Sequence, residues 1–288
     1  MTESHPVEDP AHVESKPKGH PDEQAGLYRH IDHVALAVKD ILQASELFQK
    51  VFQLDLTMRL SYPPDGVHTN LVLSLGPESE LELMGPIGER GFLCDFLRKQ
   101  GEGVHHLALE VTDIDRATAD LESRGVRVFA RTAFKGMRFT ILHPASTLSV
   151  GMQLMQRSSR KPSRNPLVQG IDRVAVRVSD PPAGRDFFLG RLKARAVGEG
   201  RDEQLHCAWE RFVVGATRFD LLYDFSGPSP KAASDGLHHV ALRVVDLEQA
   251  VRHFGALRIE PLAPWSGEES VFLPSDRMCG CLWRIVQG

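Results

Sequence analysis

Four polar residues interrupt apolar segments in the first half of the chain, and their side chains are of types that bind transition metals. His33 and His106 each lie in a run of alternating apolar residues, two positions before a small alanine. Because side chains alternate across a strand, each histidine shares a face with its alanine, which leaves room beside the imidazole ring. Glu82 and Gln153 interrupt two later apolar runs. Two imidazoles, one carboxylate and one amide oxygen can bind a divalent transition metal and leave positions open for a substrate.

Each of these residues, taken singly, also fits a structural role, because a lone histidine in a strand is often a core or surface side chain. Glu82 fits that alternative less well, since buried carboxylates are rare unless they are paired. The matched strand positions of all four residues favour the metal site. By the same alternation, His105 and His238 point to the opposite face of their strands from His106 and His239. We expect them to be structural or to face outward.

The elements that position these residues repeat along the chain. Residues 31–40 (IDHVALAVKD) match 171–180 (IDRVAVRVSD), and residues 103–117 (GVHHLALEVTDIDRA) match 236–250 (GLHHVALRVVDLEQA). The residues at corresponding positions of the four quarters are His33, His106, Arg173 and His239. Four quarters of nearly constant length indicate a repeated supersecondary unit.

Each quarter begins with an alternating segment that predicts a strand, as at residues 33–38. A segment with a period near 3.6 follows and predicts a helix, as at residues 41–48. Short runs typical of strands complete the quarter, as at residues 70–75 and 81–84. The predicted unit is therefore β-α-β-β-β, and the predicted fold class is α+β with four such modules.

Length and two polar segments predict the domain organisation. A chain of 288 residues is long enough for two domains of about 150 residues each. Residues 1–28 are rich in proline and charge, and we expect a disordered tail in which the histidines in or beside it are solvated. These histidines are His5, His12, His20 and His30. Residues 157–169 are basic and rich in serine and proline, which predicts a linker between domains at 29–156 and 170–288.

Composition excludes several classes of protein. The formal net charge of −4 has the wrong sign for a general nucleic-acid binder. No uncharged apolar run approaches the ~18 residues of a membrane span. The four cysteines are scattered, which suggests neither a zinc site nor a disulfide framework. The first residues do not resemble a signal peptide, so we expect a cytoplasmic protein.

The second half of the chain departs from the metal pattern. We assign the corresponding positions there to Arg173, Asp220, His239 and Trp283. Arginine is not a metal ligand and tryptophan offers only an N–H donor, so we predict no metal in this half. We expect an ion pair between Arg173 and Asp220. The half either serves packing alone or uses Arg173 to bind an anionic ligand.

With these residues in view, the chain from about residue 30 to its end resembles the vicinal oxygen chelate superfamily of glyoxalases, bleomycin-resistance proteins and extradiol dioxygenases. Residues 30–156 are most similar to the methylmalonyl-CoA epimerases, through segments such as HIDHVALAVKD, ELELMGPIG, GEGVHHLALEVTDI, LESRGVRV and VGMQLMQ. The resemblance implies two tandem domains, each a cupped mixed β-sheet with helices outside. It also implies that His33, Glu82 and His106 bind a divalent metal (Co, Ni, Mn, Zn or Fe), with Gln153 as the fourth ligand.

Gln153 stands where these epimerases and glyoxalases normally have a glutamate, which in many members also transfers the proton. An amide can coordinate a metal but cannot take a proton. With one carboxylate ligand, a divalent ion and its ligands carry a net charge of roughly +1, which strengthens the Lewis acid. His68 is the candidate acid/base group, because an imidazole has a pKa near neutrality. The alternative for His68 is an exposed turn residue.

The resemblance implies a metal-dependent isomerase, epimerase or lyase that stabilises the enolate of a small acyl thioester or α-oxo acid. Two other functions stay open: a dioxygenase, because two tandem module pairs resemble the extradiol enzymes, and a small-molecule binding or resistance protein without catalysis. The expected partner is a small molecule, such as an acyl-CoA or an α-oxo or hydroxy acid. Four modules in one chain make a monomer feasible, and a homodimer is also possible.

Overall fold

The structure is a computed structural model that describes the chain except for residues 1–25, 62–66, 161–162, 203–206, 225–234 and 263–269. Most of the predicted tail therefore lies outside the described residues, and so do His5, His12 and His20. The first strand already begins at Tyr28, which is buried. His30 lies within this strand with Nε2 3.2 Å from a carboxylate oxygen of Glu110, so our expectation of a solvated side chain was wrong for this residue.

The first of two mixed sheets has eight strands in the order β2-β3-β4-β1-β5-β8-β7-β6. Its central strand β1 is parallel to β4 and antiparallel to β5. The strands are β1 (Tyr28–Ala37), β2 (Leu56–Ser61), β3 (His68–Ser74), β4 (Glu80–Pro86), β5 (Gly103–Val111), β6 (Val128–Phe134), β7 (Met137–Leu142) and β8 (Met152–Arg157).

The second sheet repeats this order with seven strands, β10-β11-β12-β9-β13-β15-β14. Its strands are β9 (Val168–Arg177), β10 (Arg195–Asp202), β11 (Cys207–Val214), β12 (Thr217–Asp224), β13 (Gly236–Val244), β14 (Ser270–Leu273) and β15 (Trp283–Gln287). The α+β class with two curled mixed sheets is confirmed.

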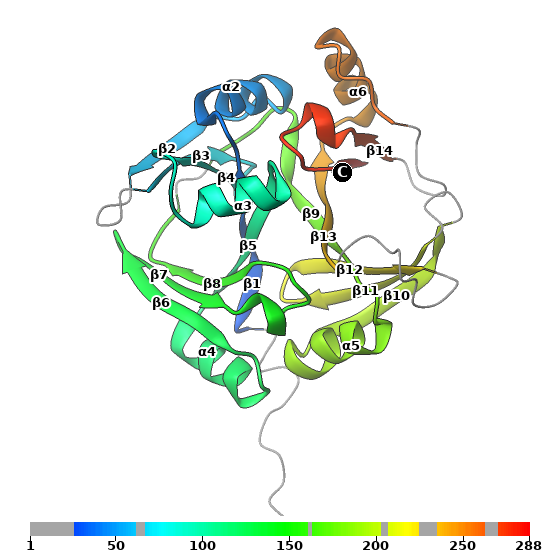
Figure 1. Ribbon diagram of the computed structural model, residues 1–288. Helices are drawn as coiled ribbons and strands as arrows, with labels where there is room; N and C mark the ends of the chain where they lie inside the picture. The colour runs from blue at the N-terminus through cyan, green and yellow to red at the C-terminus, as the bar shows by residue number, and fades with distance from the viewer. Residues whose placement is uncertain (1–25, 62–66, 161–162, 203–206, 225–234, 263–269) are drawn as a thin grey trace, which may run out of the picture.

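Helices lie outside the sheets, with one exception. Figure 1 shows α2, α4, α5 and α6 around the periphery of the molecule, whereas α3 lies over the first sheet. The helices are α2 (Ile41–Val51), α3 (Phe92–Gln100), α4 (Ile114–Ser123), α5 (Pro181–Arg185), continued by a π-helical turn at Asp186–Arg191, and α6 (Leu247–Ala256). Among the described residues, no helix has the length and apolar character needed to cross a membrane.

One large hydrophobic core contains side chains from both halves of the chain. Trp283 of β15 is fully buried, with its ring centroid 5.8 Å from that of Phe48 and 5.3 Å from that of Phe52. Burial of such large aromatic side chains is the main favourable contribution to a core of this kind. The two halves are therefore packed together.

A smaller apolar cluster forms beneath α3, where Leu93 packs on Ala35, Ala37 and Met84 of the first sheet. Helix α3 thus covers one end of the concave face and leaves the rest of that face open. The small alanines on β1 allow the helix to approach.

The central strands of both sheets contain β-bulges at matching places. In the pairing of β1 with β5 the extra residues include Asp32 and His105, and in the pairing of β9 with β13 they include Asp172 and His238. A bulge opposes two residues to one and re-aims a side chain. Strict alternation therefore fails at these four positions.

Candidate metal centre

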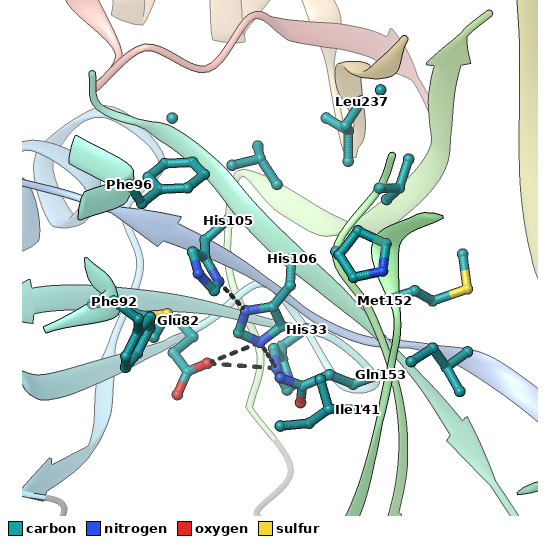
Figure 2. A pocket seen from close by; sticks show the side chains of 18 of the residues that line it. His33, Glu82, Phe92, Phe96, His105, His106, Ile141, Met152, Gln153 and Leu237 are labelled. Atoms are coloured by element: carbon teal, nitrogen blue, oxygen red, sulfur yellow. Dashed lines mark hydrogen bonds and ion pairs between the residues drawn. The ribbon is translucent and has the colours of Figure 1, made fainter. Parts of the chain in front are cut away.

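Three side chains from adjacent central strands of the first sheet converge on its concave face. Nε2 of His33 (β1) and Nε2 of His106 (β5) lie 3.1 Å apart. The Oε2 atom of Glu82 (β4) lies 3.5 Å from the first nitrogen and 3.6 Å from the second. Figure 2 shows the carboxylate and the two imidazoles directed toward one another.

These distances fit a common metal ion. Nitrogen and oxygen ligands about 2.0–2.2 Å from one ion, at angles of about 90° to 120°, are separated by about 2.8–3.8 Å. All three measured separations fall in that range, and all three side chains are buried. Within the described part of the chain, this is the one group of three or more His, Cys, Asp or Glu side chains whose ligand atoms cluster so closely.

Asp32 determines which nitrogen of His33 faces the cluster. Its carboxylate lies 2.7 Å from Nδ1 of His33. Because an ionised carboxylate can only accept, Nδ1 carries a proton and Nε2 is the nitrogen that faces Glu82. Burial raises the pKa of the Asp32 carboxyl, but the hydrogen bond from His33 and the charges of Arg160 and Arg157 outweigh it and hold the pKa well below its usual range.

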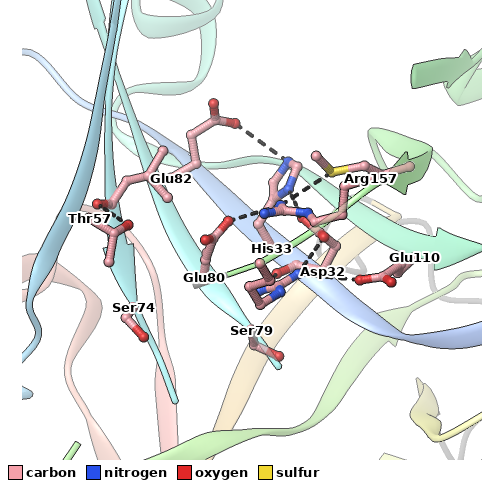
Figure 3. A network of polar contacts seen from close by, with 12 residues as sticks. Asp32, His33, Thr57, Ser74, Ser79, Glu80, Glu82, Glu110 and Arg157 are labelled. Carbon is pink, nitrogen blue, oxygen red and sulfur yellow. Dashed lines mark hydrogen bonds and ion pairs between the residues drawn. The ribbon is translucent and has the colours of Figure 1, made fainter. Parts of the chain in front are cut away.

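Two arginines complete the surroundings of Asp32. Arg157, at the end of β8, donates to Asp32 at 2.5 Å and to Glu80 at 2.9 Å, and Arg160 also pairs with Asp32. Figure 3 shows this network on the side of His33 that faces away from Glu82. A buried carboxylate of this kind is stable only with such partners.

Glu82 and His106 are held by other neighbours. The side-chain amide of Asn70 (β3) donates to Oε1 of Glu82, which leaves Oε2 for the cluster. Burial, together with the nearby His33 and His105, lowers the pKa of His106 well below its usual value. His106 is thus a neutral imidazole with a lone pair for a metal.

Gln153 and Gly151 approach the centre from β8 and the turn before it. Gln153 pairs with Ala108 of β5 and lines the same pocket as His33, Glu82 and His106. Figure 2 shows it beside His33. A side chain at Gly151 would come within 2.3 Å of the carbonyl oxygen of His105 and 3.0 Å of Cβ of His106. Glycine is therefore required where β8 passes the metal centre.

The centre lies at one side of a cavity of about 1150 Å³. His68 begins β3 and is buried rather than exposed, with its ring centroid 5.1 Å from that of Phe92 on α3, and it lines this cavity. The alternative of an exposed turn residue was wrong. His105 also lines the cavity, because the bulge turns it to the same side as His106, so our expectation that it could face outward was wrong as well.

Comparison with known proteins agrees with this geometry. The sequence profile of the Glyoxalase/Bleomycin resistance protein/Dioxygenase superfamily matches residues 32–141. The mitochondrial methylmalonyl-CoA epimerase of Dictyostelium discoideum is 31% identical over 132 residues, which cover 44% of this chain and 78% of the relative. The ethylmalonyl-CoA/methylmalonyl-CoA epimerase of Cereibacter sphaeroides is 31% identical over 119 residues, covering 40% of this chain and 87% of the relative.

The chain belongs to the glyoxalase/bleomycin resistance/dioxygenase superfamily. The region that the superfamily profile matches contains His33, Glu82 and His106 but ends before Gln153. The fold as a whole is also shared with a solved structure. A mutant of 4-hydroxymandelate synthase from Streptomyces coelicolor aligns with a TM-score of 0.71 at 15% identity, covering 91% of this chain and 93% of that chain.

The second sheet of this superfamily member carries ion pairs at the corresponding place. Nε of Arg173 lies 3.0 Å from Asp220, as predicted, and its guanidinium also donates to Asp172 at 2.5 Å. Arg211 donates to the same Asp220 at 2.7 Å. His239 is buried beside them, and burial lowers its pKa well below the usual value. Among the described residues of this half, no three His, Cys, Asp or Glu side chains bring their ligand atoms as close together as those of His33, Glu82 and His106.

Trp283 does not occupy the position we assigned to it. Ala241 of β13 pairs with Arg284, just as Ala108 of β5 pairs with Gln153, so Arg284 is the counterpart of Gln153. Trp283 is turned the other way, into the core between the halves. Because the side-chain period of a strand is two, a shift of one residue moves a side chain to the opposite face.

Proposed function

We propose that this chain is a metal-dependent enzyme of the isomerase or lyase type, acting on an acyl thioester or an α-oxo acid. The observation that carries the proposal is the convergence of His33, Glu82 and His106, at separations that fit one ion, beside a cavity large enough for a substrate. The epimerases among its relatives support the choice of reaction class.

The proposed ligands each have a defined task. A bound divalent cation supplies Lewis-acid stabilisation of the negative charge that develops on a carbonyl oxygen when the α-proton leaves. His33, Glu82 and His106 hold it, and Gln153 supplies an uncharged fourth ligand. Asp32 and Asn70 orient two of these side chains through the hydrogen bonds described above. Such outer partners typically change metal affinity by about 10- to 100-fold when they are removed.

The proton at the α-carbon needs a separate acceptor, because the amide of Gln153 cannot take it. We assign this task to His68. It lines the cavity on β3, the strand next to Glu82, and its ring lies against Phe92. An imidazole so placed can remove the α-proton of a bound substrate, and this proton can exchange with water before a proton is returned to the enolate.

Exchange of the α-proton in deuterium oxide tests this proposal. Zinc- or cobalt-loaded protein is mixed with methylmalonyl-CoA, or with pyruvate and longer 2-oxo acids, and exchange is followed by NMR. We expect exchange by the wild type and none by His106→Ala. His68→Gln should retain the metal but exchange about 10²–10⁴ times more slowly. His239→Ala, at the matching place of the second sheet, is the control and should behave as the wild type. Protein that holds metal but exchanges none of these substrates would contradict the proposal.

A dioxygenase is the second candidate, because two histidines and one carboxylate with open positions are also the ligand set of non-haem iron(II) oxygenases. Oxygen consumption separates the two functions. Iron(II)-loaded protein that consumes oxygen with a catechol or a 2-oxo acid, and does not exchange an α-proton, would favour the dioxygenase.

A further inference from the structure

The cavity above the metal centre is bounded by both halves of the chain. Residues of the second half that line it include Leu237 and His238 at the start of β13 and Cys281 and Leu282 just before β15. His238 is turned to this side by the bulge in β13, so our expectation that it could face outward was wrong. Figure 2 shows Leu237 across the cavity from Glu82, with the histidines between them.

Tight packing fixes the position of this second-half wall. Gly280, next to Cys281, has a positive φ of 74°, and a Cβ there would lie 1.8 Å from the carbonyl oxygen of Glu102. Only glycine permits so close an approach of the two backbones. On the other side of Leu282, Trp283 is buried against two phenylalanines of the first half. The wall is therefore part of the packed core.

Away from the metal centre, apolar side chains form much of the cavity lining. Phe92 and Phe96 of α3, Phe139 and Ile141 of β7, and Leu237 of β13 line it. None of the described lining residues is a lysine or an arginine, whereas Glu102 and Asp235 are among them. Burial lowers the pKa of His238 to about 4, so this side chain is uncharged near neutral pH. These walls suit hydrocarbon and disfavour a second anionic group.

The size of the cavity also favours a substrate with a long apolar part. Its volume of about 1150 Å³ is slightly above the few hundred to about 1,000 Å³ usual for small-molecule sites. An acid of three or four carbons bound at the metal would leave most of the apolar wall in contact with water.

We propose that Leu237 and its neighbours in the second half select a substrate whose chelating oxygens are attached to a long, uncharged apolar body, in preference to a small or dicarboxylic one. This inference rests on the proposed metal centre and narrows its substrate class. The second half then has a function in the active site even though it lacks ligands of its own.

A series of 2-oxo acids tests the inference by calorimetry on zinc-loaded protein, without any need for turnover. Pyruvate, 2-oxohexanoate and 2-oxooctanoate present the same chelating oxygens on increasing lengths of hydrocarbon. We expect 2-oxohexanoate to bind at least about tenfold more tightly than pyruvate, since burial of each additional methylene strengthens binding about fourfold. 2-Oxoadipate has the same number of carbons as 2-oxohexanoate but carries a second carboxylate at its far end. It should bind at least about tenfold more weakly than 2-oxohexanoate.

Variants of the wall locate the preference. Leu237→Ala should weaken 2-oxohexanoate binding severalfold and leave pyruvate binding unchanged. Leu237→Arg should narrow or reverse the preference for 2-oxohexanoate over 2-oxoadipate. Val245→Ala and Val245→Arg, at a half-exposed position of the second half that does not line the cavity, are the matched controls and should retain the wild-type pattern.

Several results would overturn the inference. Metal-loaded protein that binds pyruvate as tightly as 2-oxohexanoate, or 2-oxoadipate as tightly as 2-oxohexanoate, would contradict it while the proposed metal centre stands. The same holds if the Leu237 variants match the Val245 controls. Protein that binds no metal would contradict both proposals, and metal content is measured on each sample to tell these cases apart.

Discussion

The Asp32 carboxylate lies 2.7 Å from Nδ1 of its neighbour in sequence, His33, and this short contact is possible because the strand bulges at Asp32. In a regular strand the two side chains would point to opposite faces. The bulge brings both to the concave side, where His33 is a proposed metal ligand and Asp32 is its hydrogen-bond acceptor. A loss of this contact leaves the imidazole free to rotate or to change tautomer.

We therefore predict that Asp32→Asn weakens metal binding by about 10- to 100-fold. The matched control is Asp172→Asn, at the equivalent bulge of the second sheet, where the aspartate pairs with Arg173. Both substitutions disturb a buried ion pair and should lower the free energy of unfolding, by up to about 3–5 kcal/mol. Only the first should change the dissociation constant for zinc, measured by competition with a chromophoric chelator. Equal affinities in the two variants would contradict this role of Asp32.

Gly151 allows β8 to pass close to the strand that carries His106. We predict that Gly151→Ala pushes His106 out of place, lowers the free energy of unfolding by about 1–3 kcal/mol and weakens metal binding. Gly255→Ala in α6 is the control, because a Cβ there meets nothing within 4 Å. That change should stabilise the protein by about 0.5–1 kcal/mol, since alanine is the better helix former. Denaturant unfolding with and without zinc measures both effects.

Trp283 joins the two halves through Phe48 and Phe52. Because the side chain is fully buried, Trp283→Ala should cost about 3–5 kcal/mol of unfolding free energy. Trp209→Ala, at a half-buried position of β11, should cost clearly less. Urea unfolding provides the comparison, and similar losses in the two variants would show that the core between the halves is less important than its packing indicates.

Glu210 provides a test of pH dependence away from the metal centre. Its pKa is lowered by the hydrogen bond from Arg185, against an opposing effect of burial, with a further contribution from Tyr223. A lowered pKa in the folded state means that the contribution to stability is present above the unfolded value of about 4.3 and is lost as the pH falls through the folded value.

We predict that Glu210→Gln lowers the free energy of unfolding by about 1 kcal/mol at pH 7, a modest figure because the Arg185 side chain is 42% exposed. The difference from the wild type should shrink as the pH falls below about 4. Urea titrations at pH 7, 5 and 3.5 measure it. A difference that grows toward acid pH would have the wrong sign.

The cluster of His33, Glu82 and His106 could be predicted from the sequence because these residues obey simple alternation. His33 and His106 each share a face with a small alanine, and both alanines are buried in the sheet. Glu82 pairs across the sheet with Ala35 of β1, which places it beside both histidines. The repeat of these segments also predicted that one unit of secondary structure recurs along the chain.

The bulges could not be predicted from periodicity, because one extra residue leaves the apolar pattern on either side intact. Asp32, His105 and His238 were therefore misplaced or overlooked. The assignment of Trp283 failed for a related reason, since the sequence alone does not show which residue of β15 pairs with Ala241. Asn70 precedes an apolar run, but its contact with Glu82 depends on how β3 and β4 pair.

The most direct test of the account is the metal content of the protein. Wild-type protein purified without chelators, or reconstituted with cobalt(II) and desalted, is analysed for metal per chain alongside His106→Ala and its second-sheet counterpart His239→Ala. The account predicts one divalent ion per chain in the wild type and in His239→Ala, and none in His106→Ala. A folded wild-type chain without metal, or a His106→Ala chain that retains its ion, would contradict it.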